Sequence, residues 1–242
     1  MQTVAVGIFC KTPAAGLSKT RLSPPLRPED CAVLSGCFIR DLAETMAALA
    51  REGGITPYAI YTPAGTEREL RALLPAGFRL LLQASADFGV RVLQATGDLL
   101  EEGHAGAIVV NADSPTLPAS ILRDAVAAVR GKDCVVLSPA LDGGYTLIGL
   151  SRPHAHLFRD IPWSTPQVYR LTLERAAEIG LPAVAVPGWY DVDDRESLAL
   201  LEAELAGEQL PFAAAGLVGA AAPATREFLA TRNAPARAGA GW

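Results

Sequence analysis

A run of basic and small residues follows the first apolar segment and could hold a phosphate group. It begins at Lys11 and contains Gly16, Lys19 and Arg21. Turns rich in glycine and alanine let backbone amides approach a ligand, while Arg supplies a planar fork and Lys a point charge. The spacing is neither that of a P-loop nor that of a Rossmann dinucleotide site. We predict that this loop binds a diphosphate; an ordinary solvated basic loop is the alternative.

Carboxylates follow two further apolar segments, each of which is typical of a buried strand. Asp113 follows the fourth such segment, and Asp191 and Asp193 follow the last one. Carboxylates suit Mg²⁺ or Mn²⁺, which takes its other ligands from water and substrate phosphates. We expect one ion to lie between the two loops. The alternative for Asp113 is capping of the following helix, and Asp194 is predicted to be the N-cap of the last long helix.

A glycine pair and a tryptophan segment are candidates for contacts to a second substrate. Gly143-Gly144 predicts a hairpin turn, or close approach of the backbone to a sugar or acceptor. Asp142 beside it could bind hydroxyls or deprotonate one. A later segment could close over the same ligand or simply cap a helix with a packed tryptophan. It consists of Trp163, Ser164 and Thr165.

Alternating strands and helices must position these residues. The predicted strands are 4–9, 55–61, 78–82, 107–110, 134–137, 145–150 and 183–186. The predicted helices run from Pro28 to the Gly53-Gly54 pair, over 67–74, 88–100 and 120–129, from Thr165-Pro166 to Gly180, and over 195–205. This alternation predicts an α/β fold with a mostly parallel sheet flanked by helices.

The strand at 145–150 follows its predecessor too closely for a helical crossover. Some antiparallel pairing is therefore expected, and the sheet should be mixed. Ligands of open α/β sheets bind at the carboxyl ends of the strands. The loops that carry Lys19, Asp113 and Asp193 should therefore meet at one edge.

Composition limits the functional classes. Half of the 242 residues are apolar, enough for a sizeable core. A net charge of −5 argues against a nucleic-acid partner, which needs a basic surface. The amino terminus lacks the basic region and cleavage site of a signal peptide, and no apolar run reaches the ~18 residues of a membrane span. We expect a cytoplasmic protein whose four cysteines are buried free thiols.

Residues 1–206 are predicted to form one domain. The remaining residues, 207–242, are rich in Ala, Gly and Pro. We expect them to be a loosely attached tail with one short helix at 225–231 and no chemical role.

Five motifs, taken in order, resemble one bacterial family of the GT-A glycosyltransferase superfamily. They read FCKTPAAGLSKTRL, NADSPTLP, LDGGYTLIGL, IPWSTPQV and YDVDDRESL. Some members of this family are assigned to arsenosugar biosynthesis, and guanylyltransferases share its fold. The resemblance runs from Val4 to Leu201 and implies a Rossmann-like GT-A fold. It also implies nucleotide phosphates on the Lys11 to Arg21 loop and a metal on Asp113, with Asp193 as the second ligand.

The motif that follows the third strand in this family usually reads Q-x-x-x-D-L-G-x-R. Gln83, Asp87 and Arg91 match it, with Phe88 in place of Leu. The resemblance therefore adds these three residues to the nucleotide site. The family usually has Gly-Thr before the metal aspartate, where this chain has Asn111-Ala112. Neither departure removes a charged ligand.

The resulting hypothesis is metal-dependent transfer of a sugar from a nucleoside-diphosphate donor to a small acceptor. Lys19 and Arg21 would stabilise charge on the leaving nucleoside diphosphate, and Asp142 would position or deprotonate the acceptor. One alternative is a nucleotidyltransferase that joins a nucleoside triphosphate to a phosphorylated acceptor and releases pyrophosphate. A non-enzymatic nucleotide-binding protein is a third. The sequence does not define the base, sugar, acceptor, stereochemistry or oligomeric state.

Overall fold

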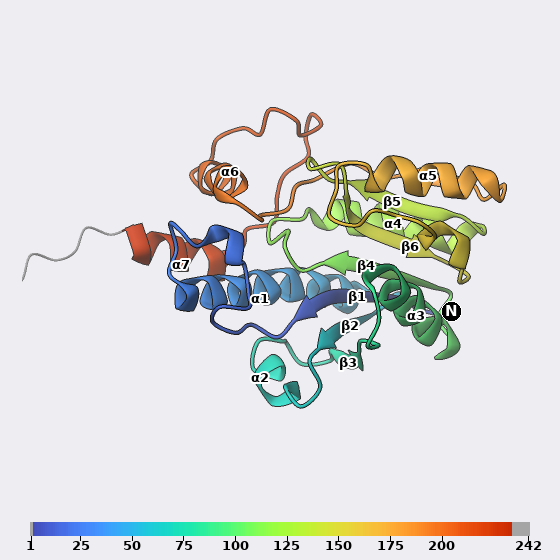
Figure 1. Ribbon diagram of the computed structural model, residues 1–242, viewed down its shortest axis with the longest axis horizontal. Coiled ribbons are helices and arrows are strands. Elements are labelled where there is room, and N and C mark those ends of the chain that lie inside the picture. Colours follow the sequence, from blue (N-terminus) through green and yellow to red (C-terminus); the bar gives the residue numbers. More distant parts are fainter. Residues whose placement is uncertain (1, 234–242) are drawn as a thin grey trace, which may run out of the picture.

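A computed structural model describes residues 2–233 of the chain. Within them, seven strands form one sheet in the order β3-β2-β1-β4-β6-β5-β7 (Figure 1). Neighbouring strands are parallel except where β6 pairs with β4 and β5, so the predicted mixed, mostly parallel sheet is confirmed. The strands are β1 (Val4–Lys11), β2 (Ile55–Thr62), β3 (Arg79–Leu82), β4 (Gly106–Asn111), β5 (Val135–Pro139), β6 (Tyr145–Leu150) and β7 (Ala183–Ala185).

Helices cover both faces of the sheet (Figure 1). One face packs on α1 and α4, with α6 and α7 joining the same core, and the other packs on α3, α5 and η2. The α-helices are α1 (Pro28–Glu52), α2 (Glu67–Arg71), α3 (Phe88–Glu101), α4 (Ala119–Gly131), α5 (Val168–Glu178), α6 (Arg195–Leu205) and α7 (Pro223–Asn233). Two short 3₁₀ helices are η1 (Thr20–Leu22) and η2 (Ala155–Phe158).

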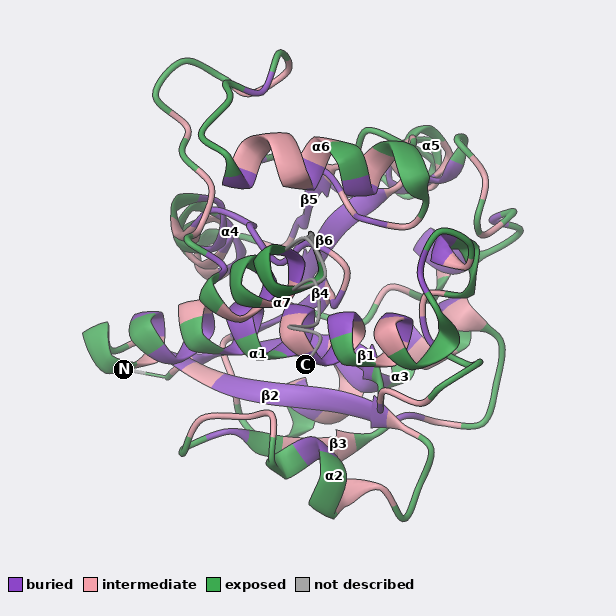
Figure 2. Ribbon diagram, turned by 90° about the vertical axis from the view of Figure 1, so that its left-hand side faces the viewer, coloured by how far each residue is buried: buried purple, intermediate pink, exposed green. Residues whose placement is uncertain are grey.

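The central strands read as continuous apolar runs because both of their faces are covered. In β1, Val4, Val6 and Ile8 belong to the core under α1 and α4, whereas Ala5 belongs to the core under α3 and α5. Figure 2 shows that most of β2 is buried. The two hydrophobic cores hold the strand ends in fixed relative positions.

The sheet brings several strand ends to one edge. The parallel strands β1, β4 and β5 all end there, and the antiparallel β6 begins there. After β1 the chain adds β2 and β3 on one side of the sheet, and after β4 it adds β5, β6 and β7 on the other. The direction of the strand order therefore changes between β1 and β4. Open α/β sheets bind ligands in the crevice at such a switch point. The loops after β1 and β4 therefore flank the expected ligand position.

The end of the chain is anchored more firmly than we expected. The predicted helix at 225–231 is present and extends over Pro223–Asn233 as α7. Asp41, buried in α1, accepts hydrogen bonds from the backbone N–H groups of Ala224 and Thr225, and Leu229 joins the core. The expectation of a loosely attached tail is thus wrong as far as Asn233, because the anchoring carboxylate lies far earlier in the chain. The rest of that segment, 234–242, lies outside the described residues.

Two expectations from composition can be compared with the structure. Among the described helices, none combines the length and hydrophobicity that a membrane span requires. All four cysteines are free, and Cys10, Cys31 and Cys134 are buried, whereas Cys37 is partly exposed.

Candidate functional site

Lys19 occupies the centre of the site. Its ammonium lies 2.7 Å from Asp113 Oδ1 and 2.9 Å from Asp193 Oδ1, and it donates to the backbone oxygen of Val192 at 2.7 Å. The Lys19 side chain is only 5% exposed. Burial lowers the pKa of Lys19, but the two carboxylates more than offset this effect, so the net pKa shift is upward. Lys19 is therefore a charged ammonium enclosed by the two aspartates predicted to bind a metal.

The loop after β1 is shaped by its own polar groups. The buried Ser18 hydroxyl accepts a hydrogen bond from the Ala14 N–H at 3.0 Å, which closes the loop on itself. Lys19 then takes a left-handed conformation, with φ of 48°, and η1 follows, anchored by the buried Leu22. A left-handed backbone is costly for a residue other than glycine. The ion pairs of the Lys19 side chain offset that cost.

The structure brings the two predicted acidic loops together. The Val192 N–H donates to the backbone oxygen of Asp113 at 2.9 Å, which ties the segment after β7 to the segment after β4. Arg21 lies at the surface of this junction, with Nη2 2.5 Å from Asp193 Oδ2. Asp193 therefore contacts both cations of the loop after β1.

Helix capping separates the roles of the acidic residues. Asp194 caps α6 in a capping box with Ser197, as predicted. The capping alternative for Asp113 is wrong, because α4 begins only at Ala119 with Pro118 at its N-cap. The Asp113 carboxylate therefore faces the site rather than a helix end.

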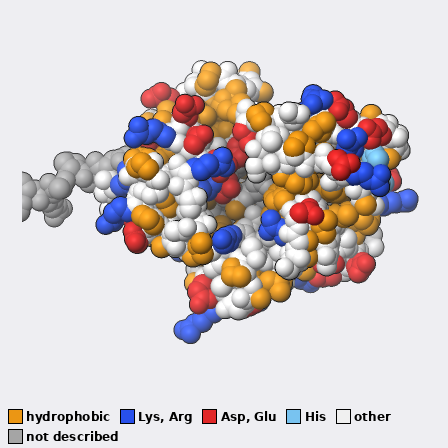
Figure 3. Space-filling view, viewed as in Figure 1, with side chains coloured by type: hydrophobic (Ala, Val, Ile, Leu, Met, Phe, Trp, Pro, Cys, Tyr) orange, Lys and Arg blue, Asp and Glu red, His pale blue; other side chains and the backbone are white. Residues whose placement is uncertain are grey.

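Two adjoining cavities share the Asp113–Asp193 cluster. The first, called here the basic cavity, has a volume of about 250 Å³ and is lined by Lys11, Ser18, Lys19 and Arg21 among others. The second, the acidic cavity, has a volume of about 400 Å³. Figure 3 shows charged side chains of both signs around a hollow in this face. The charged residues that line the acidic cavity are Arg21, Arg91, Asp113, Asp142, Asp191 and Asp193.

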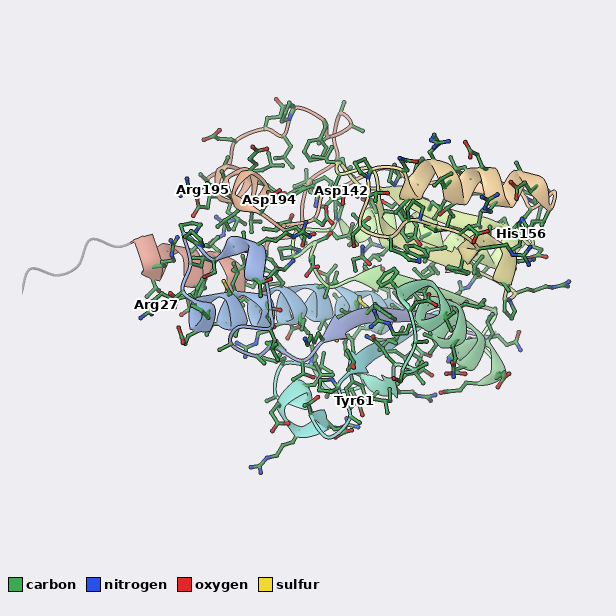
Figure 4. All side chains as sticks on the ribbon, viewed as in Figure 1. Arg27, Tyr61, Asp142, His156, Asp194 and Arg195 are labelled. Carbon is green, nitrogen blue, oxygen red and sulfur yellow. The ribbon has the colours of Figure 1, made fainter. Side chains whose placement is uncertain are left out.

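Asp142 and Asp191 give the acidic cavity its character. Burial raises the pKa of Asp191 to about 7, and the nearby negative charges of Asp142, Asp193 and Asp113 contribute to the shift. Asp142 Oδ1 accepts a hydrogen bond from the Gly144 N–H at 2.8 Å, which fixes its carboxylate on the hairpin turn. In Figure 4, Asp142 lies between the β5–β6 pair and the start of α6, where Asp194 is labelled.

The hairpin between β5 and β6 packs against the segment that precedes α5. Gly143 has φ of 87°, and a Cβ there would lie 2.2 Å from the Pro166 backbone oxygen. The Tyr169 N–H donates to the Gly143 oxygen at 2.9 Å. The close approach at Gly143 is thus to the protein's own chain, whereas Gly144 lines the acidic cavity.

The predicted Trp163-Ser164-Thr165 segment lines the acidic cavity. Our prediction that Thr165 caps α5 is wrong, because the helix begins at Val168 with Gln167 at its N-cap. The Thr165 hydroxyl instead donates to the Pro162 oxygen at 2.7 Å, and Ser164 takes a left-handed conformation with φ of 62°. Because of these turns, α5 begins later in the chain than we predicted.

Aromatic rings form one wall of the acidic cavity. The ring centroids of Trp163 and Phe88 are 4.9 Å apart, and those of Phe88 and Phe9 are 5.5 Å apart. A Cβ at Gly89 would lie 2.7 Å from Trp163 Cζ2, so only glycine admits the indole there. The Arg91 guanidinium lies 5.6 Å from both phenylalanine rings.

The residues of the third-strand motif have contacts within the protein. The buried Gln83 amide donates to the backbone oxygens of Cys10 and Ile60 and accepts from Arg91 Nη1 at 2.8 Å. Asp87 is the N-cap of α3 and accepts from the Val90 N–H. These contacts connect β1, β2 and α3 below the cavity. Direct nucleotide contacts by Gln83, Asp87 and Arg91 stay a prediction.

Two other predicted phosphate ligands are Lys11, the last residue of β1, and Gly16, in the loop that follows. Lys11 is exposed and lines the basic cavity, whereas Gly16 lies in an exposed turn with φ of 72°. Their roles toward a nucleotide stay predictions as well.

Our sequence reasoning missed two residues with polar side chains that line the acidic cavity, Asn111 and Tyr145. Asn111 Nδ2 donates to the Tyr145 backbone oxygen at 2.9 Å and so links β4 to β6. The Tyr145 hydroxyl is buried and has no hydrogen-bond partner among residues 2–233. Both stand at strand ends of the same edge, and that position could have indicated them.

The two carboxylates suit a divalent cation whose coordination is completed by a bound ligand. Asp113 and Asp193 already contact the same cation, the Lys19 ammonium. Within residues 2–233, no group of three or more His, Cys, Asp or Glu side chains could hold a metal. Mg²⁺ is commonly bound by one or two carboxylates together with substrate phosphates. The two aspartates therefore match such an ion, not a cage built from protein alone.

Solved structures share this fold. A protein of Desulfovibrio desulfuricans G20, provisionally assigned as a nucleotide-diphospho-sugar transferase, is 25% identical over 97% of this chain and 96% of its own, with a TM-score of 0.80. CMP:2-keto-3-deoxy-manno-octonic acid synthetase, solved with CTP, is 12% identical over 86% and 100%, with a TM-score of 0.55. The 4-diphosphocytidyl-2C-methyl-D-erythritol synthase of Anaerococcus prevotii DSM 20548 is 9% identical over 83% and 96%, with a TM-score of 0.52. These last two show the fold alone.

The comparisons define first a class and then a family. The chain has the GT-A-like fold of nucleotide-diphospho-sugar transferases and is an enzyme of the transferase class. Residues 45–165 match the family described as "Uncharacterized protein conserved in bacteria (DUF2064)", and the chain belongs to that family. That match includes Asp113 and Asp142. No curated protein sequence matches the chain significantly.

Proposed function

We propose that this protein transfers a sugar from a nucleoside-diphosphate donor to a small acceptor with the help of Mg²⁺ or Mn²⁺. The observation that carries the proposal is the convergence of Asp113, Asp193, Lys19 and Arg21 between two cavities. The similarity to the Desulfovibrio protein over nearly the whole of both chains supports it.

The donor diphosphate would bind where the basic cavity meets the Asp113–Asp193 cluster. Lys11 and Arg21 line that cavity and are exposed enough to reach a ligand. Cations placed where the nucleoside diphosphate departs stabilise the charge that develops on it. The basic cavity is therefore the nucleotide side of the proposed site.

Asp113 and Asp193 would hold the divalent ion, which, when bound, neutralises the diphosphate and acts as a Lewis acid on the leaving group. Lys19 now contacts both carboxylates, so its ammonium competes with any metal for the same oxygens. An arriving diphosphate offers Lys19 an alternative anion. Donor and metal should therefore bind together rather than separately.

The acceptor would bind in the acidic cavity. Asp142 stands on the rigid turn of the β5–β6 hairpin, where its free oxygen can accept a hydrogen bond from an acceptor hydroxyl. A carboxylate in that position orients the hydroxyl and can accept its proton as the sugar is transferred. The aromatic wall at Trp163 excludes water from one side of the acceptor.

A binding screen tests the proposal. Melting temperature is measured with UDP-, GDP-, CDP- and ADP-sugars and with the matching triphosphates, each with and without Mn²⁺. We expect a nucleotide sugar to raise the melting temperature, and the rise to require Mn²⁺. Preference for a triphosphate, with pyrophosphate release in the presence of a phosphorylated acceptor, would identify a nucleotidyltransferase instead. No response to any nucleotide would contradict both activities.

A further inference from the structure

The acidic cavity holds carboxylates that the protein itself leaves unpaired. Asp193 is paired with Arg21 and Lys19, and Asp113 is paired with Lys19. Within residues 2–233, neither Asp142 nor Asp191 forms a salt bridge, although both line the cavity. The side of the cavity away from the donor is therefore negative.

Arg91 also lines the cavity and carries a positive charge, but its guanidinium is held by contacts within the protein. Its Nη1 donates to the Gln83 side-chain oxygen, and its guanidinium lies against the rings of Phe9 and Phe88. Arg91 Nε is buried and lacks a hydrogen-bond partner among the described residues. The contacts with Gln83 and the two rings hold the guanidinium in the aromatic wall of the cavity.

The opposite sides of the cavity differ in chemistry. An ionised carboxylate accepts hydrogen bonds and cannot donate them, so Asp142 selects hydroxyl or ammonium donors. Trp163 and Phe88 offer flat apolar surface on the other side, suited to the C–H face of a ring.

We propose that the acceptor is a hydroxylated molecule without negative charge, such as a neutral or amino-substituted sugar or polyol, and that phosphorylated acceptors are excluded. The inference rests on the proposed function and deepens it, because it assigns the acidic cavity to a chemical class. A phosphate group carries up to two negative charges at neutral pH and would lie beside two unpaired carboxylates. Like charges placed together across an interface suppress the wrong partner.

The test measures the charge of the cavity directly. Ser164→Cys places a thiol on the exposed lining of the acidic cavity, in a Cys37→Ser background that removes the one partly exposed native cysteine. The rate of thiol modification is measured with a cationic and an anionic methanethiosulfonate reagent of similar size. The ratio of the two rates is divided by the same ratio measured for glutathione. The Cys37→Ser protein alone is the blank.

Leu17→Cys in the same background is the matched control, because Leu17 is exposed on the lining of the basic cavity. We expect the S164C variant to prefer the cationic reagent by about tenfold or more, and L17C to prefer the anionic one. Replacing Asp142 and Asp191 by Asn should reduce the preference of S164C and leave L17C unchanged. Thr165→Cys serves the same purpose should S164C fail to fold.

The measurement is repeated with Mn²⁺ together with UDP, GDP, CDP or ADP, because the acceptor meets the donor-bound enzyme. Cationic preference that persists in S164C supports the proposal. Anionic preference, or equal rates, in either state would overturn it. If none of the four nucleotides slows modification of L17C, the proposed donor site fails, and this outcome is distinct from failure of the acceptor assignment.

Discussion

Two polar clusters lie at opposite edges of the same sheet and are built differently. At the amino edge, the hydroxyl of Tyr58 in β2 donates to Glu102, accepts from Arg79 and contacts His104 Nε2. His104 Nδ1 contacts the hydroxyl of Thr3, so the series of contacts extends to the residue that precedes β1. No buried side-chain atom of this cluster lacks a partner within the described residues.

At the carboxyl edge the balance is different. Lys19 and Arg21 satisfy Asp113 and Asp193, but Asp142 and Asp191 are left without a cation, and two cavities adjoin the cluster. A fully satisfied polar network specifies structure, whereas an incompletely satisfied one needs an explanation, such as a ligand. The excess of carboxylates, rather than polarity itself, therefore distinguishes the edge that carries the candidate site.

The largest effect is expected from Asp113→Asn. The change keeps the shape of the side chain but removes an anionic ligand, so Mn²⁺-dependent nucleotide affinity should fall at least about tenfold. Because Lys19 keeps Asp193 and the Val192 oxygen as partners, the melting temperature should fall by only a few degrees. Calorimetric titration and thermal unfolding measure the two quantities. Unchanged affinity would remove Asp113 from the metal site.

Lys19→Ala should separate metal from nucleotide binding. Without the competing ammonium, Mn²⁺ alone should bind more tightly, while nucleotide affinity should fall by about tenfold, the size of a hydrogen bond to a charged group. Electron paramagnetic resonance of free Mn²⁺ follows the first change without any nucleotide. Lys11→Ala, at the exposed end of β1 beside the same loop, is the matched control and should leave Mn²⁺ binding alone unchanged. Weaker Mn²⁺ binding in K19A would show that Lys19 positions the aspartates rather than competing with a metal.

Tyr58→Phe tests the opposite edge. The hydroxyl links three polar partners and the side chain is 1% exposed, so its loss should reduce the free energy of unfolding by about 1–3 kcal/mol. Nucleotide affinity should not change. Urea denaturation and the same titration check both statements, with Tyr169→Phe as a control, because the Tyr169 hydroxyl has no hydrogen bond among residues 2–233. A loss of nucleotide affinity in Y58F at unchanged stability would contradict this expectation and show that the two edges are coupled.

The smallest effect is expected from Asp87. Asp87→Ala removes the cap of α3 and should destabilise the protein by about 1 kcal/mol, whereas Asp87→Asn keeps the cap and should be neutral. If Asp87 acts only as a cap, nucleotide affinity stays the same in both variants. A fall in affinity in D87N at unchanged melting temperature would instead assign Asp87 to the nucleotide site, as the resemblance implies.

Local sequence patterns predict the elements and their order. Continuous apolar runs predicted β1, β2 and β4, and the Gly143-Gly144 pair predicted the hairpin that makes the sheet mixed. Because parallel strands end at one edge, the residues after them were predicted to meet there. The contacts of Lys19 with Asp113 and Asp193 agree with that prediction.

Tertiary structure alone decided which groups are paired. Lys19, Lys11 and Arg21 have similar charge in one short loop, but only the packing of Val192 on Asp113 gives Lys19 a buried position between two carboxylates. The anchoring of α7 by Asp41 is of the same kind. Periodicity and turn chemistry are local and can be found in a short stretch of sequence, whereas the partner of a buried charge lies far along the chain and is fixed only once both hydrophobic cores have formed.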